Sequence, residues 1–293
     1  MATKTSEIYL TNQPEHFICR LVFSFIFLDL IMSGFSNTLI HQLQSPVLIF
    51  PYIDPTFWIM HLLRIPEFIS SNHLIAWSWD FALFGSCLGI IIYPGKKQLV
   101  AVFLFLYFIY YIIFNSFGAH HTHSLIPVLM APVPFLFSKK SFLFCWEGLR
   151  YFLLFSYSAA FFWKLLRLSW LFKEQGVLIM KENLTPYLYF NPHSFLSQIY
   201  FYFLDHPGLT QFFLLSGFVF EGIFIIGFFT KKYDKYLLIL SLILPFGFWF
   251  FADAVFIEQI ILSLTLIPIA FYSGMENSFK IQTGIINKKP LSH

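Results

Sequence analysis

The stretch LVAVFLFLYFIYYIIFNSF, residues 99–117, decides the fold. It is a continuous run of apolar and aromatic residues without Asp, Glu, Lys, Arg or His, and Lys96 and Lys97 lie just before it. A helix needs about 20 such residues to cross the roughly 30 Å hydrocarbon core of a bilayer. The stretch is therefore predicted to be a transmembrane helix.

The rest of the chain has the same character. Of 293 residues, 58% are hydrophobic, only 11% are charged, and 42 are Phe. A soluble domain has about 25% charged residues, and it could not hide this much apolar surface from water. The composition predicts an all-α, polytopic integral membrane bundle that has membrane lipid as its partner and no separate soluble domain.

Other apolar runs of similar length raise the expected number of transmembrane helices to about eight. The run 195–204 is too short to span, and we interpret it as a re-entrant or interfacial piece of a long 166–208 loop. The division expected is an N-terminal segment 1–16, a transmembrane domain 17–273 and a tail 274–293. The other expected spans are 17–35, 74–93, 122–138, 144–165, 209–229, 235–252 and 255–273.

Lysine pairs predict the topology. They occur at residues 96–97, 139–140 and 231–232, in alternate loops. Because cytoplasmic loops collect Lys and Arg, these loops and both termini are predicted to be cytoplasmic. Residues 1–16 lack the basic start and the cleavage site of a secretory signal, so we expect no cleaved leader.

This topology places most of the unusual polar residues on the outer membrane face, so a functional site is best sought there. Lys164 has two interpretations: its amine extends to the headgroups, or it points into the bundle and acts as a base. Asp253 and Glu258 flank a short turn and are either solvated or near that lysine. The remaining members of this set are His120, His121 and His123.

Other patterns exclude classes of site. The three neighbouring histidines have no carboxylate or cysteine beside them, so we predict no metal site, and His123 is the best placed to act within the bundle. Cys19, Cys87 and Cys145 are far apart and are predicted to form no disulfide. The net charge of +3 without a basic tract argues against nucleic acid.

Carboxylates within the expected spans need partners, because an intramembrane charge is costly. Asp29, Asp80 and Glu221 are interpreted as structural hydrogen-bonding groups rather than as a proton relay. Glu147 and Arg150 are three residues apart on one helix, which is the spacing of a local ion pair.

Several motifs occur in the order found in a known membrane domain. The chain resembles the transmembrane part of vitamin K-dependent gamma-glutamyl carboxylase and the related bacterial HTTM (horizontally transferred transmembrane) proteins over about residues 17–273. The resemblance implies a cell (inner) membrane location. The motifs are CRLVFSFIFLDL (19–30), ALFGSCLGIIIYPGKK (82–97), HSLIPVLMA (123–131), LRYFLLFSYSAAFFWKL (149–165) and FVFEGIFIIGFFTKK (218–232).

The resemblance implies candidate catalytic residues. Lys164 matches the family's base, which deprotonates a reduced quinone, while His123 and Tyr157 match residues that hold this cofactor. The chain departs from the family pattern at Thr122, Trp163 and Trp249. It also lacks the soluble part with which the carboxylase grips its peptide.

Two classes of function therefore stay open. One is a membrane enzyme that acts on a quinol, resembling vitamin K hydroquinone, or on another lipid-soluble substrate. Lys164 would be its base, and His123 and Tyr157 would orient the substrate oxygen. The other is a non-catalytic scaffold or assembly subunit of the same fold, whose Phe-rich surface contacts a membrane protein partner.

Overall fold

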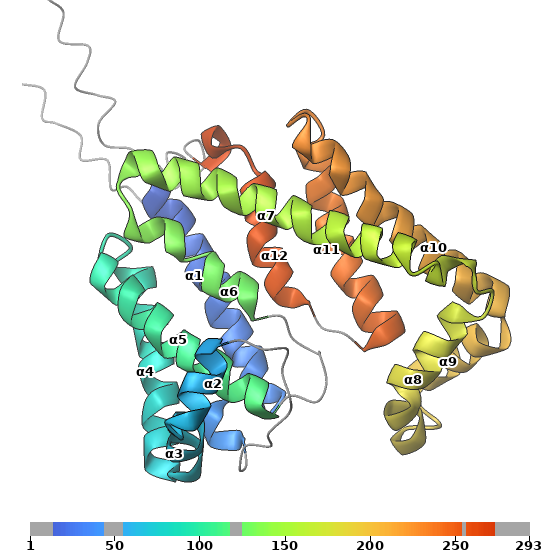
Figure 1. The fold of residues 1–293 in the computed structure, drawn as a ribbon, viewed down its shortest axis with the longest axis horizontal. Helices are drawn as coiled ribbons and strands as arrows, with labels where there is room; N and C mark the ends of the chain where they lie inside the picture. The colour runs from blue at the N-terminus through green and yellow to red at the C-terminus, as the bar shows by residue number, and fades with distance from the viewer. Residues whose placement is uncertain (1–13, 44–54, 118–124, 254–255, 273–293) are drawn as a thin grey trace, which may run out of the picture. The chain divides into compact units, whose positions relative to one another are not determined.

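A computed structural model describes residues 14–43, 55–117, 125–253 and 256–272, which form helices and no strand, so the all-α class is confirmed within these ranges (Figure 1). Five helical segments are long and apolar enough to cross a membrane. The described chain thus has the helices of a multi-pass membrane protein. The five segments are Pro14–Gln42, His73–Ile92, Lys97–Asn115, Pro207–Phe228 and Asp234–Ala252.

The described part of the chain contains α-helices and short 3-10 helices. The α-helices are α1 (Pro14–Phe35), α2 (Pro55–Leu62), α3 (Ile65–Ser71), α4 (His73–Ile92), α5 (Lys97–Phe117), α6 (Ile126–Met130), α7 (Lys139–Leu166), α8 (Gln175–Phe190), α9 (Phe195–Asp205), α10 (Pro207–Ile223), α11 (Asp234–Ala252) and α12 (Ile257–Ser263). The 3-10 helices are η2 (Ile40–Gln42), η3 (Val133–Leu136), η4 (Ser169–Leu171), η5 (Phe224–Phe228) and η6 (Leu264–Leu266).

Three of the eight expected spans are not among these five segments. The run 144–165 lies within α7, which is long enough to cross a bilayer but carries charged residues along its length. The run 122–138 contains the short helices α6 and η3, since Pro127, Pro132 and Pro134 interrupt the backbone hydrogen bonding. The run 255–273 is likewise divided between α12 and η6. The number of eight spans stays a prediction.

The expected loop 166–208 is in fact largely helical. Helices α8 and α9 form a hairpin around a core that contains Met180, Leu184 and Tyr200. This core packs against aromatic residues of α11, and burial raises the pKa of the Tyr200 phenol to about 12. The prediction of a long loop is wrong here, whereas the interpretation of 195–204 as a re-entrant or interfacial piece stays a prediction.

The chain divides into two compact units. Unit 1 comprises residues 1–117, 132–145 and 267–293, and unit 2 comprises residues 118–131 and 146–266. In unit 1, helix α4 packs against both α1 and α5. The Cys87 thiol of α4 donates a hydrogen bond to the Phe23 carbonyl oxygen of α1 at 3.4 Å, so these helices approach closely.

In unit 2, two glycines allow α10 and η5 to lie against α7. A Cβ atom on Gly227 would be 2.5 Å from a methyl group of Leu154, and one on Gly222 would be 2.9 Å from the Phe161 ring. Tyr157 of α7 stacks on Phe224 of η5, with ring centroids 4.2 Å apart. Both glycines thus permit close contact of α10 and η5 with α7.

Candidate functional site

In the first half of α7, a buried arginine joins this helix to α11. Arg150, only 2% exposed, donates two hydrogen bonds to the Asp234 carboxylate, at 2.8 Å from Nε and 2.6 Å from Nη2. Its Nη2 atom also donates to the Gly227 carbonyl oxygen at 3.0 Å. A guanidinium matches a carboxylate in this bidentate way, and the arrangement positions η5 and α11 on α7.

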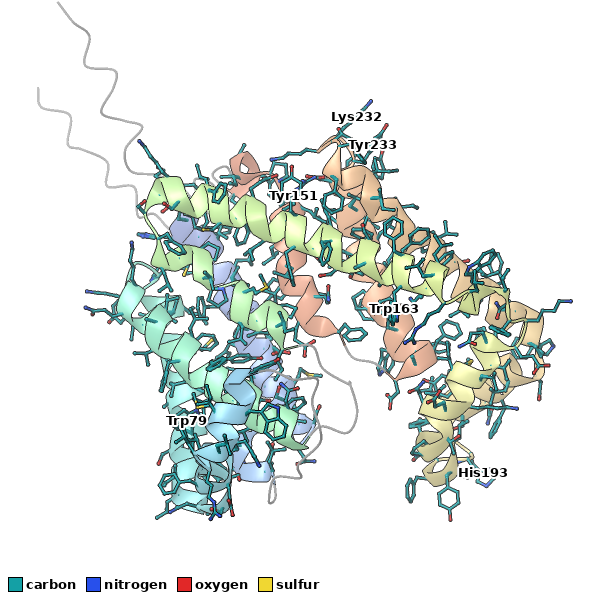
Figure 2. All side chains as sticks on the ribbon, viewed as in Figure 1. Trp79, Tyr151, Trp163, His193, Lys232 and Tyr233 are labelled. Atoms are coloured by element: carbon teal, nitrogen blue, oxygen red, sulfur yellow. The ribbon has the colours of Figure 1, made fainter. Side chains whose placement is uncertain are left out.

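The predicted pair between Glu147 and Arg150 is confirmed, with 3.5 Å between Oε1 and Nη1. Glu147 also accepts a hydrogen bond from Lys231 at 2.6 Å. Lys232 and Tyr233 lie in the same turn before α11, and the Lys232 side chain extends away from the ribbon (Figure 2). The predicted cytoplasmic lysines 231 and 232 therefore lie at the Arg150 end of unit 2.

Toward the other end of α7, Lys164 forms an ion pair with Glu221 of α10. The Nζ and Oε1 atoms are 2.5 Å apart, and Glu221 is only 1% exposed, whereas the Lys164 side chain is 36% exposed. Glu221 lies well inside the Pro207–Phe228 span. The lysine amine therefore reaches a carboxylate between the helices, and Lys164 and Arg150 are about 20 Å apart along α7.

A cavity of about 290 Å³ adjoins this ion pair. Its polar members come from three helices: Ser156, Tyr157 and Lys164 from α7, Glu221 from α10, and Gln259 from α12. The other lining residues are Ala160, Phe248, Ala252 and Phe256. A mostly apolar cavity with a few converging polar groups is the usual form of a small-molecule site.

Three buried polar atoms at this cavity have no hydrogen-bond partner in the described part of the chain. They are the Tyr157 hydroxyl, Glu221 Oε2 and Gln259 Oε1. Lys164 also faces the Phe248 ring, with its Nζ atom 5.5 Å from the ring centroid. Buried polar atoms are normally paired, so these three are available to a bound molecule.

The structure brings together two of the three predicted catalytic residues. Lys164 and Tyr157 line one cavity. His123 lies outside the described residues, as do His120, His121 and Thr122.

Three of the cavity's polar residues, Ser156, Glu221 and Gln259, were not predicted as site residues from the sequence. It had suggested Asp253 or Glu258 as a holder of Lys164, but the lysine pairs with Glu221. Gln259 was not considered at all. The only sequence signal for Glu221 was a carboxylate within an apolar run.

Two departures from the family pattern lie outside this cavity. Trp163 is 56% exposed, and the Arg167 guanidinium lies 4.2 Å from the centroid of its ring. Trp249 is 44% exposed. Neither belongs to the cavity lining, which instead includes their neighbours Lys164 and Phe248. These two departures therefore leave the cavity unobstructed.

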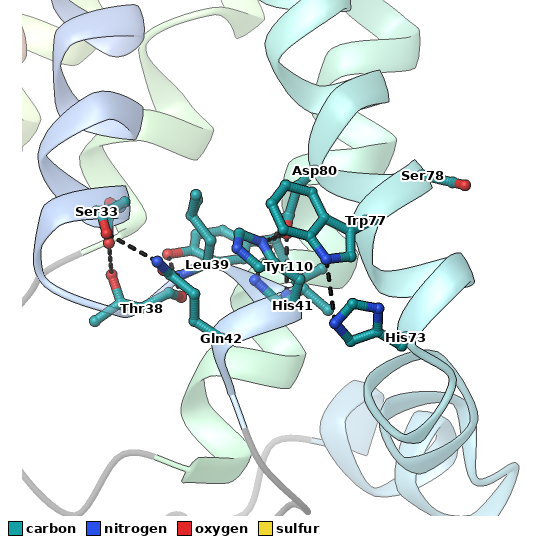
Figure 3. Close-up of polar contacts among 12 residues, drawn as sticks. Ser33, Thr38, Leu39, His41, Gln42, His73, Trp77, Ser78, Asp80 and Tyr110 are labelled. Atoms are coloured by element: carbon teal, nitrogen blue, oxygen red, sulfur yellow. Dashed lines mark hydrogen bonds and ion pairs between the residues drawn. The ribbon is translucent and has the colours of Figure 1, made fainter.

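A second polar cluster, in unit 1, is structural. The Asp80 carboxylate of α4 accepts hydrogen bonds from the backbone N–H groups of Ile40 and His41, at 3.3 and 3.0 Å, and from His41 Nδ1 at 2.7 Å (Figure 3). The His41 ring stacks on Trp77, with centroids 3.6 Å apart. Asp80 thus attaches the chain that follows α1 to α4, as its structural interpretation predicted.

The chain was compared with protein families, curated proteins and solved structures. No protein-family model, no curated protein and no solved structure matches the chain.

Proposed function

We propose that this protein is a multi-pass membrane enzyme that binds a lipid-soluble substrate in the cavity beside Lys164 and removes a proton from it. The observation that carries the proposal is the Lys164–Glu221 pair at an apolar cavity, 2.5 Å between Nζ and Oε1, with the Tyr157 hydroxyl unpaired among the described residues. A substrate dissolved in the bilayer suits such walls.

Lys164 and Glu221 can act together as one base. In an apolar site, the proton between Lys164 and Glu221 can lie on the carboxylate, which leaves a neutral amine. A substrate O–H bond then breaks and a new N–H bond forms at Nζ. The substrate becomes an anion, and the Lys164–Glu221 pair gains one proton and one positive charge beside it. Tyr157 would donate a hydrogen bond to the oxygen that becomes negative.

A reduced quinone is the substrate class we propose first. The chain's resemblance to the carboxylase and HTTM proteins supports this choice, because Lys164 and Tyr157 match the family's positions. Carboxylation of a protein glutamate is not part of the proposal.

The test uses decylubiquinol under anaerobic conditions, with the protein in lipid nanodiscs. Binding to the wild type should produce the red-shifted absorption of a quinol anion. Lys164→Ala should remove this absorption, and Lys164→Arg should too, because arginine stays protonated. We expect Glu221→Gln to reduce it by at least about tenfold through the loss of the charged partner.

Two further variants connect the signal to the cavity. Ala160→Phe and Ala252→Phe add a ring to different walls and should each prevent binding. Ser216→Ala is the control, because Ser216 lies on α10 outside the cavity lining, is only partly buried, and bonds only to the Phe212 carbonyl oxygen among the contacts described. An anion signal that survives in Lys164→Ala would contradict the proposal.

In the proposed topology, the protein lies in the inner cell membrane and both termini are in the cytoplasm. We expect cysteines introduced at Lys139 and Lys232 to be protected from an impermeant thiol reagent added outside intact cells. A cysteine at Lys173, between α7 and α8, should react and serves as the control. Labelling at Lys139 or Lys232 but not at Lys173 would reverse the topology.

A non-catalytic scaffold is the second candidate function. The observation that favours it is the exposure of large aromatic side chains on unit 2: Phe190, Phe195 and Phe229 are each more than three-quarters exposed. Such a surface suits a membrane protein partner as well as lipid. Under this proposal, the cavity variants would leave assembly with the partner unchanged.

A further inference from the structure

We infer that the cavity recognises hydrogen-bond donors, so that its ligand is an apolar molecule whose polar end carries an O–H or N–H group, and that Gln259 selects for that group. The inference rests on the proposed binding function and adds a chemical requirement to it. It assigns a role to a residue of α12, which neither composition nor motif order brought to attention.

The unpaired oxygen atoms of Glu221 and Gln259 are hydrogen-bond acceptors. Glu221 Oε1 already contacts Lys164 Nζ, whereas Glu221 Oε2 and Gln259 Oε1 are buried and have no partner in the described ranges. A carboxylate oxygen and an amide oxygen cannot donate. A ligand that ends in a ketone or an ether would leave both acceptors unpaired, while a hydroxyl or an amine would pair with one of them.

The geometry allows one ligand group to reach both sides of the site. Gln259 belongs to α12 and Glu221 to α10, and both line the same cavity as Tyr157 and Lys164. A hydroxyl could donate to one of the two acceptors and accept from the Tyr157 hydroxyl. The remaining walls, formed by alanine and phenylalanine, suit an apolar body.

Matched probes test the inference. 4-Nonylphenol and its methyl ether, 4-nonylanisole, share an apolar body and differ in the donor. An equimolar mixture is added to the detergent-solubilised full-length protein, and native mass spectrometry measures the ratio of the two bound species. We expect the wild type to prefer the phenol by about tenfold, since an unpaired buried acceptor opposes binding of the ether.

Substitution of the selecting residue should reduce this preference. Gln259→Met keeps the length of the side chain but removes the acceptor, so the preference should fall to about threefold or less. Gln98→Met is the matched control: Gln98 is exposed on α5 of unit 1 and should leave the preference unchanged. 4-Nonylaniline, which donates through N–H, should bind like the phenol.

The outcomes separate this inference from the proposed function. If both probes bind equally and Ala160→Phe displaces both, the cavity binds apolar ligands but does not select donors, and only the inference fails. The same follows if Gln259→Met keeps the full preference. If neither probe binds, or if Ala160→Phe displaces neither, the inference and the proposed binding site fail together.

Discussion

Replacing Arg150 with Ala is expected to lower the free energy of unfolding by about 3–5 kcal/mol. The change would leave the Asp234 carboxylate, which is 8% exposed, without the guanidinium that now donates two hydrogen bonds to it. Breaking a buried ion pair on one side is costly because the remaining charge is uncompensated. Thermal and denaturant unfolding in detergent, followed by tryptophan fluorescence, would measure the loss.

Two variants test the stated cause. In Arg150→Leu/Asp234→Leu, both charges are removed and apolar groups take their place, so most of the lost stability should return. Lys231→Ala removes the other cation bound to Glu147, but Lys231 is 64% exposed, and the expected change is within about 1 kcal/mol. If the double variant is as unstable as Arg150→Ala, the destabilisation does not come from the unpaired carboxylate.

Replacing Asp80 with Ala is expected to destabilise the protein by about 2–4 kcal/mol. Asp80 accepts three hydrogen bonds, two of them from the backbone of η2, and the side chain is 4% exposed. Removing the carboxylate leaves the N–H groups of Ile40 and His41 without their acceptor. We expect the segment after α1 to detach from α4, which hydrogen–deuterium exchange would report as faster exchange at residues 38–43.

The control for this prediction lies two residues away on the same helix. Ser78 is exposed, and its hydroxyl bonds to the Leu74 carbonyl oxygen, so Ser78→Ala should change stability by less than about 0.5 kcal/mol. Asp80→Asn keeps one acceptor oxygen and should lose less than Asp80→Ala. Unchanged exchange at residues 38–43 in Asp80→Ala would show that the carboxylate does not hold this segment.

The fold class could be predicted because it depends on local composition. The run 99–117 has neither charge nor proline, and it forms α5 almost over the same residues. A helix in lipid satisfies its own backbone hydrogen bonds, so such a run has few alternatives. The 166–208 segment was misread because a helical hairpin with modest periodicity and an internal proline, Pro186, resembles a loop in sequence.

The candidate site was only partly predictable. Lys164 and Tyr157 were expected together from a resemblance alone, and their spacing of seven residues places them on one face of α7. Glu221 and Gln259 lie 57 and 95 residues further along the chain from Lys164. No local rule relates residues so far apart, so the sequence offered Asp253 and Glu258 only as an alternative to a solvated turn and did not pair Lys164 with Glu221.

By itself, the sequence determined that this chain is helical, with segments long and apolar enough to cross a membrane, because hydrophobic length acts locally along each helix. Only the tertiary structure decided what its rare polar residues do. It paired Arg150 with Asp234 and Lys164 with Glu221, and it left Tyr157, Glu221 and Gln259 with unpaired atoms at one cavity among the described residues. The physical reason is that a buried charge is stabilised by whichever partner the packing of distant helices brings within hydrogen-bond distance.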